Sequence, residues 1–242
     1  MKDYFSTASD NYARFRPTYP QELFDFLLQL CNKREKAWDC GTGSGQVAGE
    51  LANSFDQVYA TDISINQLSQ GIQKENIHYS KQAAENTVFP DAAFDLVTVG
   101  QAVHWFDFEL FYGEVKRVLK REAVIAIFGY ALFNSTPGTN KIIEDFYHNI
   151  IGTFWPQERR YLEERYQTIP FPFHEIEAPH FEMKQQWSFE RLVGYLKTWS
   201  AVKLYESEKG ENPVEIIEQE LFQSFGEVGP VNFPVILRLG RI

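Results

Sequence analysis

Cysteine is scarce in this sequence of 242 residues, which contains only two. Cys31 and Cys40 form no CxxC pair, and no histidine stands near them in the sequence. Zinc ligands and redox pairs usually come as closely spaced cysteines or as cysteines with histidines. We therefore expect no metal site, and two reduced thiols in a reducing compartment.

Long hydrophobic runs are also missing. No stretch approaches the roughly 20 apolar residues that a helix needs to span a bilayer. The first 15 residues mix charged, polar and aromatic side chains and lack the apolar segment of a secretion signal. These absences favour a cytoplasmic protein without stable membrane insertion.

Positive charge is outnumbered by negative charge. The sequence has 23 Lys and Arg against 33 Asp and Glu, a formal net charge of −10. Lys and Arg form no cluster that would attract a polyanion to one surface. We therefore expect a small-molecule partner and no nucleic acid.

Strand-like and helix-like patterns alternate in the first half of the chain. An amphipathic helix over residues 20–31 precedes the first strand. The expected strands cover residues 36–40, 57–61, 77–80, 94–99 and 123–130. The expected helices between them cover residues 46–54, 64–70 and 108–119. Such alternation predicts an α/β fold in which helices cover both faces of a mostly parallel sheet.

The pattern changes after residue 130. Helices are expected at 142–151 and 189–205, and strands at 181–187 and 231–239. Long insertions in a compact domain usually carry function, so we interpret 136–170 and 189–225 as cap helices around the last strands. The prediction is one domain over residues 1–242, with a ligand-binding core at 33–131.

A glycine-rich turn follows the first expected strand. Its acidic and small residues are Asp39, Gly41, Thr42, Gly43 and Gly45. Three glycines permit a sharp turn and leave room for a ligand close to the main chain, and the next helix points its amides at that ligand. A dinucleotide fingerprint would need a small residue where Gln46 stands, and no Gly-Lys-Ser/Thr of a P-loop follows.

A second carboxylate follows the second expected strand. Asp62, with Ile63 beside it, stands 21 positions after Gly41, about where an acidic residue reaches ribose hydroxyls in such sheets. A pyrophosphate disfavours nearby carboxylates, whereas the ammonium and sulfonium groups of S-adenosylmethionine are attracted by Asp39 and Asp62. The charges thus favour S-adenosylmethionine as the cofactor over a dinucleotide. The alternative role for Asp62 is to cap the next helix.

These motifs resemble the class I S-adenosylmethionine-dependent methyltransferases of the methyltransferase 11 type, and within them the trans-aconitate methyltransferase group. The resemblance rests on WDCGTGSG around the glycine turn, the strand that ends at Asp62, and AAENTVFPDAAFDLVTVGQAVHWFD over residues 83–107. The opening YARFRPTYP and the later YLKTWSA agree more loosely.

The resemblance implies a Rossmann-like, seven-stranded, mostly parallel sheet whose last strand is antiparallel. It implies that Ala84 and Glu85 lie beside the adenine, although Ala83 replaces the aspartate that usually precedes them. It also implies that Gln101, in the loop after the fourth strand, bonds the methionine portion of the cofactor.

In the family the N-terminal segment closes over the cofactor, which implies a lid or substrate role for Tyr12 and Arg16. Arg14 stands in the same segment. An acidic acceptor would need local positive charge in so acidic a protein. We therefore interpret the acceptor as a small carboxylic acid that Arg16 neutralises. The alternative is that both arginines are solvated or paired with acidic helices.

Methyl transfer requires mainly that the acceptor be held in line with the methyl group, so a base is optional. A carboxylate has no proton to lose, whereas a base helps when the acceptor is a phenol, an amine or a carbon acid. His104 is the candidate base, with a structural role as the alternative. Tyr19, Trp105 and Trp199 are expected to line the acceptor site. Methylation of a lipid or quinone precursor, and cofactor binding without catalysis, remain as other functions.

Overall fold

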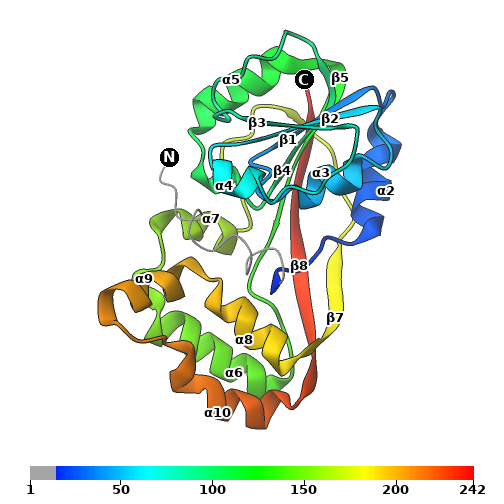
Figure 1. The fold of residues 1–242 in the computed structure, drawn as a ribbon. Helices are drawn as coiled ribbons and strands as arrows, with labels where there is room; N and C mark the ends of the chain where they lie inside the picture. Colours follow the sequence, from blue (N-terminus) through cyan, green and yellow to red (C-terminus); the bar gives the residue numbers. More distant parts are fainter. Residues whose placement is uncertain (1–14) are drawn as a thin grey trace.

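The computed structural model describes residues 15–242. Over these residues it has a sheet of eight strands in the order β3-β2-β1-β4-β5-β8-β6, with β7 pairing on β8 outside that path (Figure 1). The strands are β1 (Lys36–Cys40), β2 (Gln57–Asp62), β3 (Ile77–Lys81), β4 (Phe94–Gly100), β5 (Leu119–Tyr130), β6 (His174–Glu175), β7 (Glu182–Ser188) and β8 (Val228–Arg241).

Strands β1 to β5 run parallel, and β8 runs antiparallel to β5. All residues of β4 except Gly100 are buried, as expected of a parallel strand covered on both faces. The predicted α/β fold with a mostly parallel sheet and an antiparallel last strand is thereby confirmed. The strand number differs, because the resemblance implies seven strands and the short β6 on β8 brings the sheet to eight over residues 15–242.

Helices pack on both faces of the sheet because successive side chains of each strand point to opposite sides. The helices around the sheet are α2 (Gln21–Leu30), α3 (Gln46–Leu51), α4 (Ile65–Leu68) and α5 (Phe108–Val118). Ala37 and Leu96 belong to a hydrophobic core that includes residues of α2 and α3. Trp38 and Val97 belong to a second core, on the other face, that includes residues of α5.

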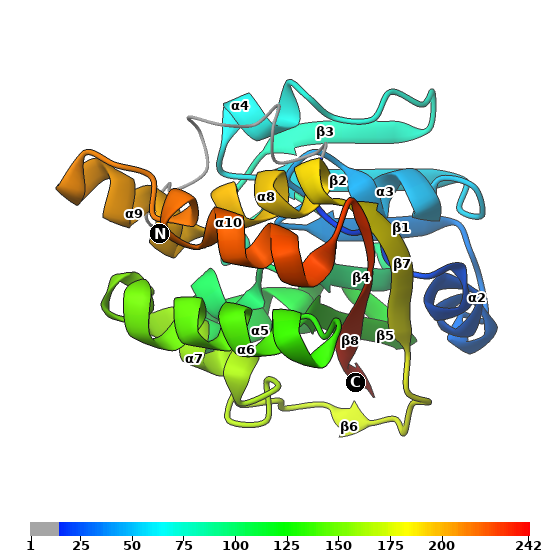
Figure 2. The ribbon, with the colours of Figure 1, turned by 90° about the horizontal axis from the view of Figure 1, so that it is seen from below.

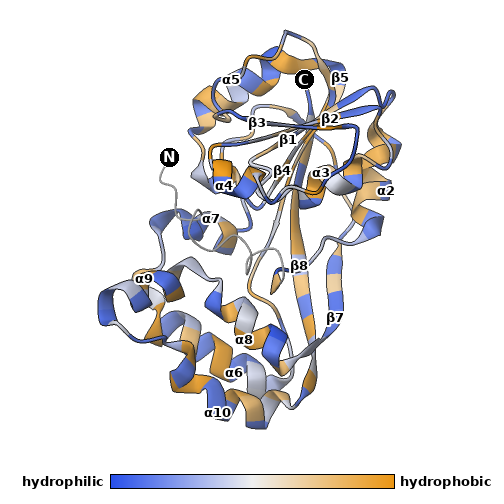
Figure 3. Ribbon diagram, in the orientation of Figure 1, coloured by the Kyte–Doolittle hydropathy of each residue, from blue (hydrophilic) through white to orange (hydrophobic). Residues whose placement is uncertain are grey.

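A second group of helices lies beyond the carboxyl ends of the parallel strands (Figures 1 and 2). These helices are α6 (Pro137–Asp145), α7 (Arg160–Glu163), α8 (Phe189–Lys197), α9 (Ser200–Lys209) and α10 (Val214–Phe225). Strand β8 joins the two parts, because residues 235–241 pair with β5 and residues 228–234 pair with β7. It is largely hydrophobic (Figure 3), and its Phe233 is fully buried.

The helix expected over residues 189–205 is two helices. The break falls at Trp199, whose backbone is extended and whose side chain is buried. The Thr198 hydroxyl donates to the Tyr195 carbonyl at 2.6 Å and so satisfies an acceptor at the end of α8. The helix expected over 142–151 begins earlier, at Pro137 behind the capping Thr136, and its last part is a π-helical turn, η2 (Phe146–Ile150).

Candidate active site

A cavity of about 260 Å³ opens at the carboxyl ends of the parallel strands. The glycine turn after β1, the end of β2, and the loop after β4 form its walls. Ligands of open α/β sheets bind at this edge, where loops from neighbouring strands diverge.

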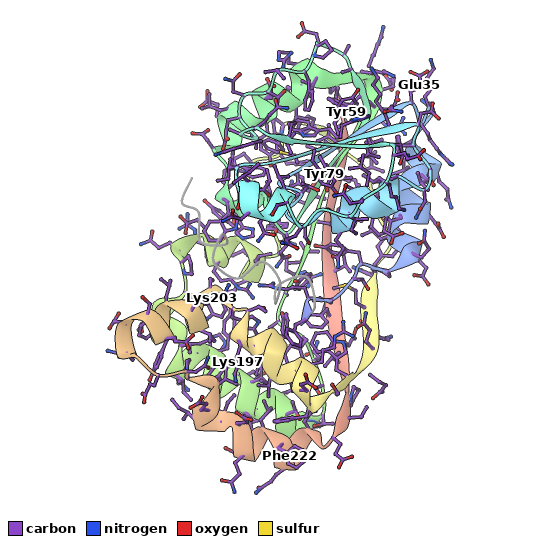
Figure 4. All side chains as sticks on the ribbon, viewed as in Figure 1. Glu35, Tyr59, Tyr79, Lys197, Lys203 and Phe222 are labelled. Atoms are coloured by element: carbon purple, nitrogen blue, oxygen red, sulfur yellow. The ribbon has the colours of Figure 1, made fainter. Side chains whose placement is uncertain are left out.

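The glycine turn needs glycine for two separate reasons. Gly41, Gly43 and Gly45 have φ angles of 67°, 55° and 77°, in the left-handed region that favours glycine. A Cβ atom on Gly41 would lie 2.7 Å from the Cβ of Ala102, and one on Gly45 would collide with the Tyr79 hydroxyl (Tyr79 is labelled in Figure 4). The turn therefore leaves bare backbone along this wall of the cavity.

Asp39 lies beneath the turn and does not line the cavity. Its carboxylate accepts hydrogen bonds from the hydroxyls of Thr42 and Thr98 and from the Ala48 backbone N–H. Burial raises the pKa of Asp39 to about 6, against the opposing effect of these hydrogen bonds. Asp39 therefore holds the glycine turn in place from below, and its carboxylate does not face the space for a ligand.

Asp62 lines the cavity together with Ile63. Its Oδ2 accepts from the Gly43 N–H at 2.9 Å and its Oδ1 accepts from the Ser64 N–H at 2.9 Å. Ser64 is itself the N-cap of α4 and accepts from the Gln67 N–H. The capping alternative for Asp62 is therefore wrong, and its carboxylate is fixed at the cavity wall.

The two residues expected beside the adenine differ in their placement. Ala84 lines the cavity, whereas Glu85 does not. The Glu85 Oε1 instead accepts from the backbone N–H of Asp107 at 3.1 Å, which ties the segment after β3 to the start of α5. Gln82, three residues before Glu85, lines the cavity in addition.

A smaller chamber of about 40 Å³ lies on the side of the second helix group. It shares Arg16, Gln101 and Trp105 with the large cavity. The walls that it does not share are His104, Trp155, Pro156, Arg159, Leu162, Trp199 and Ser200. Among the described residues that form it there is no Asp or Glu, so its charged groups are cationic.

Comparisons with known proteins agree with this geometry. The methyltransferase domain family matches residues 38–127. A protein of Dictyostelium discoideum that is named a methyltransferase is 30% identical over 99% of this chain and 95% of its own length. A solved structure from Anaeromyxobacter dehalogenans, described as a type II methyltransferase, is 37% identical, with a TM-score of 0.87 over 94% of this chain and 98% of its own. The chain belongs to the class I S-adenosylmethionine-dependent methyltransferases.

The large cavity of this methyltransferase fits its cofactor, S-adenosylmethionine. The bare backbone of the glycine turn leaves space at the wall, and Asp62 offers carboxylate oxygens that accept hydrogen bonds from hydroxyl groups. Ile63 and Ala84 add apolar surface for a planar base. Within residues 15–242 no cluster of three or more potential metal ligands occurs. None of the helices in that range combines the length and the hydrophobicity of a membrane span.

Gln101 of the methyltransferase lies at the junction of cavity and chamber with its backbone in the left-handed region, at φ 56°. Its Oε1 accepts from the Tyr130 N–H at 2.8 Å, and its Nε2 donates to the Tyr130 carbonyl at 3.3 Å. The amide expected to bond the methionine portion thus already binds backbone. Its role toward the cofactor stays a prediction, and Gln101 also shapes the wall.

His104 lies in the chamber wall and is buried. Its Nδ1 is 3.3 Å from the Tyr166 hydroxyl. Burial, and then the charges of Arg159 and Arg16, lower the pKa of His104 to about 3. The imidazole is therefore neutral near pH 7, and so weak a base is poorly suited to take a proton from an acceptor.

The remaining predicted residues lie around both cavities or outside the described residues. Arg16 lines both and donates from Nη1 to the Tyr130 hydroxyl at 2.9 Å. Tyr19 lines the large cavity and packs edge-on against Phe128, with ring centroids 4.7 Å apart. Trp199 lines the chamber. Tyr12 and Arg14 fall outside the part of the chain that the structure describes.

Sequence reasoning missed several residues of the walls, most importantly Tyr130, Gln82 and Arg159. Tyr130 ends β5 and Gln82 follows β3, so the rule that ligands bind at the carboxyl ends of strands could have found both. Arg159 is brought to the chamber by a short 3-10 turn, η4 (Gln157–Arg159), far along the chain from the strands. No local pattern marks it.

Proposed function

We propose that this methyltransferase methylates an oxygen of a small carboxylic acid, an acceptor of the trans-aconitate kind. The charge of the chamber carries the proposal: Arg16 and Arg159 line it, and its described walls contain no carboxylate. The protein as a whole has a net charge of −10, so this local excess of positive charge favours an anionic acceptor at this place.

The state of His104 supports the same acceptor class. When bound, S-adenosylmethionine supplies an electrophilic methyl group, which a carboxylate oxygen can accept without losing a proton. A neutral phenol or carbon acid reacts faster when a base removes its proton, and the lowered pKa of His104, about 3, makes it a weak base.

Positioning is the main contribution that this chain makes to the reaction. Trp105 and Arg16 lie in the wall common to the cavity and the chamber, where an acceptor would meet the cofactor. Holding two reactants in the right geometry lowers a barrier by about 7–11 kcal/mol in favourable cases. Arg16, fixed by the Tyr130 hydroxyl, would orient the carboxylate.

The proposal is tested by incubating the purified protein with S-adenosylmethionine and a panel of small carboxylic acids. Each acid is paired with its amide, which keeps the shape and removes the charge. Mass spectrometry should detect S-adenosylhomocysteine and an alkali-labile methyl ester with acids only. Methyl transfer exclusively to uncharged acceptors would contradict the proposal.

A matched pair of variants tests the role of Arg16. Arg16→Gln should raise the KM of the acid about 10-fold or more, because it removes a charge-assisted hydrogen bond to the acceptor. Arg121→Gln removes an exposed charge at the other end of β5 and should leave that KM unchanged. An equal KM in all three proteins would exclude Arg16 from acceptor binding.

A second candidate acceptor is a lipid or quinone precursor. The observation in its favour is that three tryptophans, Trp105, Trp155 and Trp199, line the chamber. Aromatic walls bind flat apolar groups well. Turnover of a phenolic quinone precursor, with none of any acid in the panel, would support this candidate over the first.

A further inference from the structure

Arg159 has a guanidinium group that is already held in one orientation. Its Nε donates to the Tyr147 hydroxyl at 2.9 Å. The guanidinium carbon lies 4.7 Å from the centroid of the Trp155 ring and 5.6 Å from that of the Tyr147 ring. Contact with two aromatic rings and one hydrogen bond fixes the planar group.

Tyr147, which accepts the hydrogen bond from Arg159, is itself held by burial and by two further hydrogen bonds. It is buried within the π-helical turn, and its hydroxyl donates to the Glu163 carboxylate at 2.6 Å. Its backbone carbonyl accepts from the Trp155 indole N–H at 3.1 Å. Burial raises the pKa of Tyr147 to about 12, so the hydroxyl keeps its proton. A single-turn π-helix inside or after an α-helix is frequent at functional sites.

The terminal amino groups of Arg159 have no acceptor within residues 15–242. The Nε atom alone makes a hydrogen bond, and no carboxylate of these residues lies within 4.0 Å of the guanidinium. The carboxylate of Glu163 accepts a hydrogen bond from the Tyr147 hydroxyl and makes none with Arg159. Two parallel N–H donors on a rigid plane match a carboxylate or another planar oxyanion.

We infer that Arg159 is a specificity-determining residue, which binds a carboxylate or similar planar oxyanion of the acceptor in the chamber, and that Tyr147 is the residue that positions it. The inference rests on the proposed function, since it assumes an acidic acceptor. It adds a second cationic contact, contributed by the turn η4 that precedes α7, to that of Arg16. Arg159 lines the chamber and not the large cavity, so it acts on the acceptor and leaves the cofactor site unchanged.

The test measures the ratio of acid to amide binding in the wild type, three test variants and one control variant. Inhibition constants for an acid and its amide are determined against turnover of the best acid of the panel. Arg159→Gln should raise the KM of the acid about 10- to 100-fold and bring the acid and the amide to similar affinity. Arg159→Lys keeps the charge without the planar fork and should fall between Arg159→Gln and the wild type.

Tyr147→Phe separates positioning from fold. It keeps the ring under the guanidinium and removes the hydroxyl, so the acid KM should rise about 3- to 10-fold. Thermal stabilisation by S-adenosylhomocysteine should stay at the wild-type value in every variant, which shows that each is folded with its cofactor site intact. Arg160→Gln, next in the chain but exposed, is the matched control with no expected change.

The outcomes separate the two proposals. If the wild type methylates no acid, the proposed function fails and this inference with it. If the wild type methylates an acid and Arg159→Gln does so with an unchanged KM and an unchanged acid-to-amide ratio, only the role of Arg159 is overturned. A Tyr147→Phe variant with wild-type KM would overturn the positioning role alone.

Discussion

The side-chain amide of Gln101 pairs with the backbone of Tyr130 as a neighbouring strand would. Its Oε1 accepts from the Tyr130 N–H at 2.8 Å and its Nε2 donates to the Tyr130 carbonyl at 3.3 Å. β4 ends at Gly100, so this amide continues the pairing of β4 with β5 for one further residue. The wall between the cavity and the chamber is thereby held by a side chain.

Replacement of Gln101 should weaken both the fold and the cofactor site. Gln101→Ala leaves the Tyr130 N–H and carbonyl without this partner, which costs about 1–3 kcal/mol in the free energy of unfolding. Gln101→Glu keeps the acceptor but turns a carboxylate oxygen toward the Tyr130 carbonyl, so it should be destabilising as well. Urea denaturation and titration with S-adenosylhomocysteine measure both effects. Wild-type values for Gln101→Ala would show that the pairing is unimportant.

The glycine turn permits a comparison between two glycines with similar backbone. Gly41→Ala places a Cβ atom 2.7 Å from that of Ala102 at φ 67°, in the cavity wall. Gly210→Ala meets nothing within 4 Å at φ 78°, at the end of α9. Both should lose about 1 kcal/mol of stability from the left-handed backbone.

Only Gly41→Ala should also lose affinity for S-adenosylhomocysteine, by about 100-fold or more, because the turn must shift. Calorimetric titration of the two variants measures this difference. Equal affinity in both would mean that the turn does not form the cofactor site.

The buried His104 should make stability depend on pH. Its pKa in the folded protein, about 3, lies below its ordinary value of about 6.5. Between these values the unfolded chain binds a proton that the folded chain does not, so stability is complete above pH 6.5 and is lost as the pH falls toward 3.

From pH 7 to pH 5 the wild type should therefore lose about 2 kcal/mol more than His104→Gln, which has no titrating group there. Urea denaturation at the two pH values measures the difference. Parallel pH dependence in the two proteins would mean that folding leaves the pKa of His104 at its ordinary value.

The cofactor-binding half could be predicted closely because its signals are local. β1 covers the residues expected from its hydrophobic pattern, and Ser64 caps α4 as expected of a serine before a helix. Asp62 lines the cavity because it ends a parallel strand, and that position follows from strand order alone.

The second helix group could be predicted only in part because tertiary contacts decide its details. The break at Trp199 and the π-helical turn at Phe146–Ile150 depend on burial of aromatic side chains between helices, and Trp199 and Phe146 have ring centroids 6.1 Å apart. The structural role of Asp39 could not be predicted from the sequence around it either. Its carboxylate accepts hydrogen bonds from the Thr98 hydroxyl and the Ala48 N–H, and only the fold brings these donors to Asp39.

Calorimetric titration of the wild-type protein tests the central claim most directly, namely that the glycine turn with Asp62 binds a sulfonium nucleoside cofactor. S-adenosylhomocysteine should give saturating heat at one site per chain, and NADH should give none. Tight binding of NADH together with no heat from S-adenosylhomocysteine would contradict it.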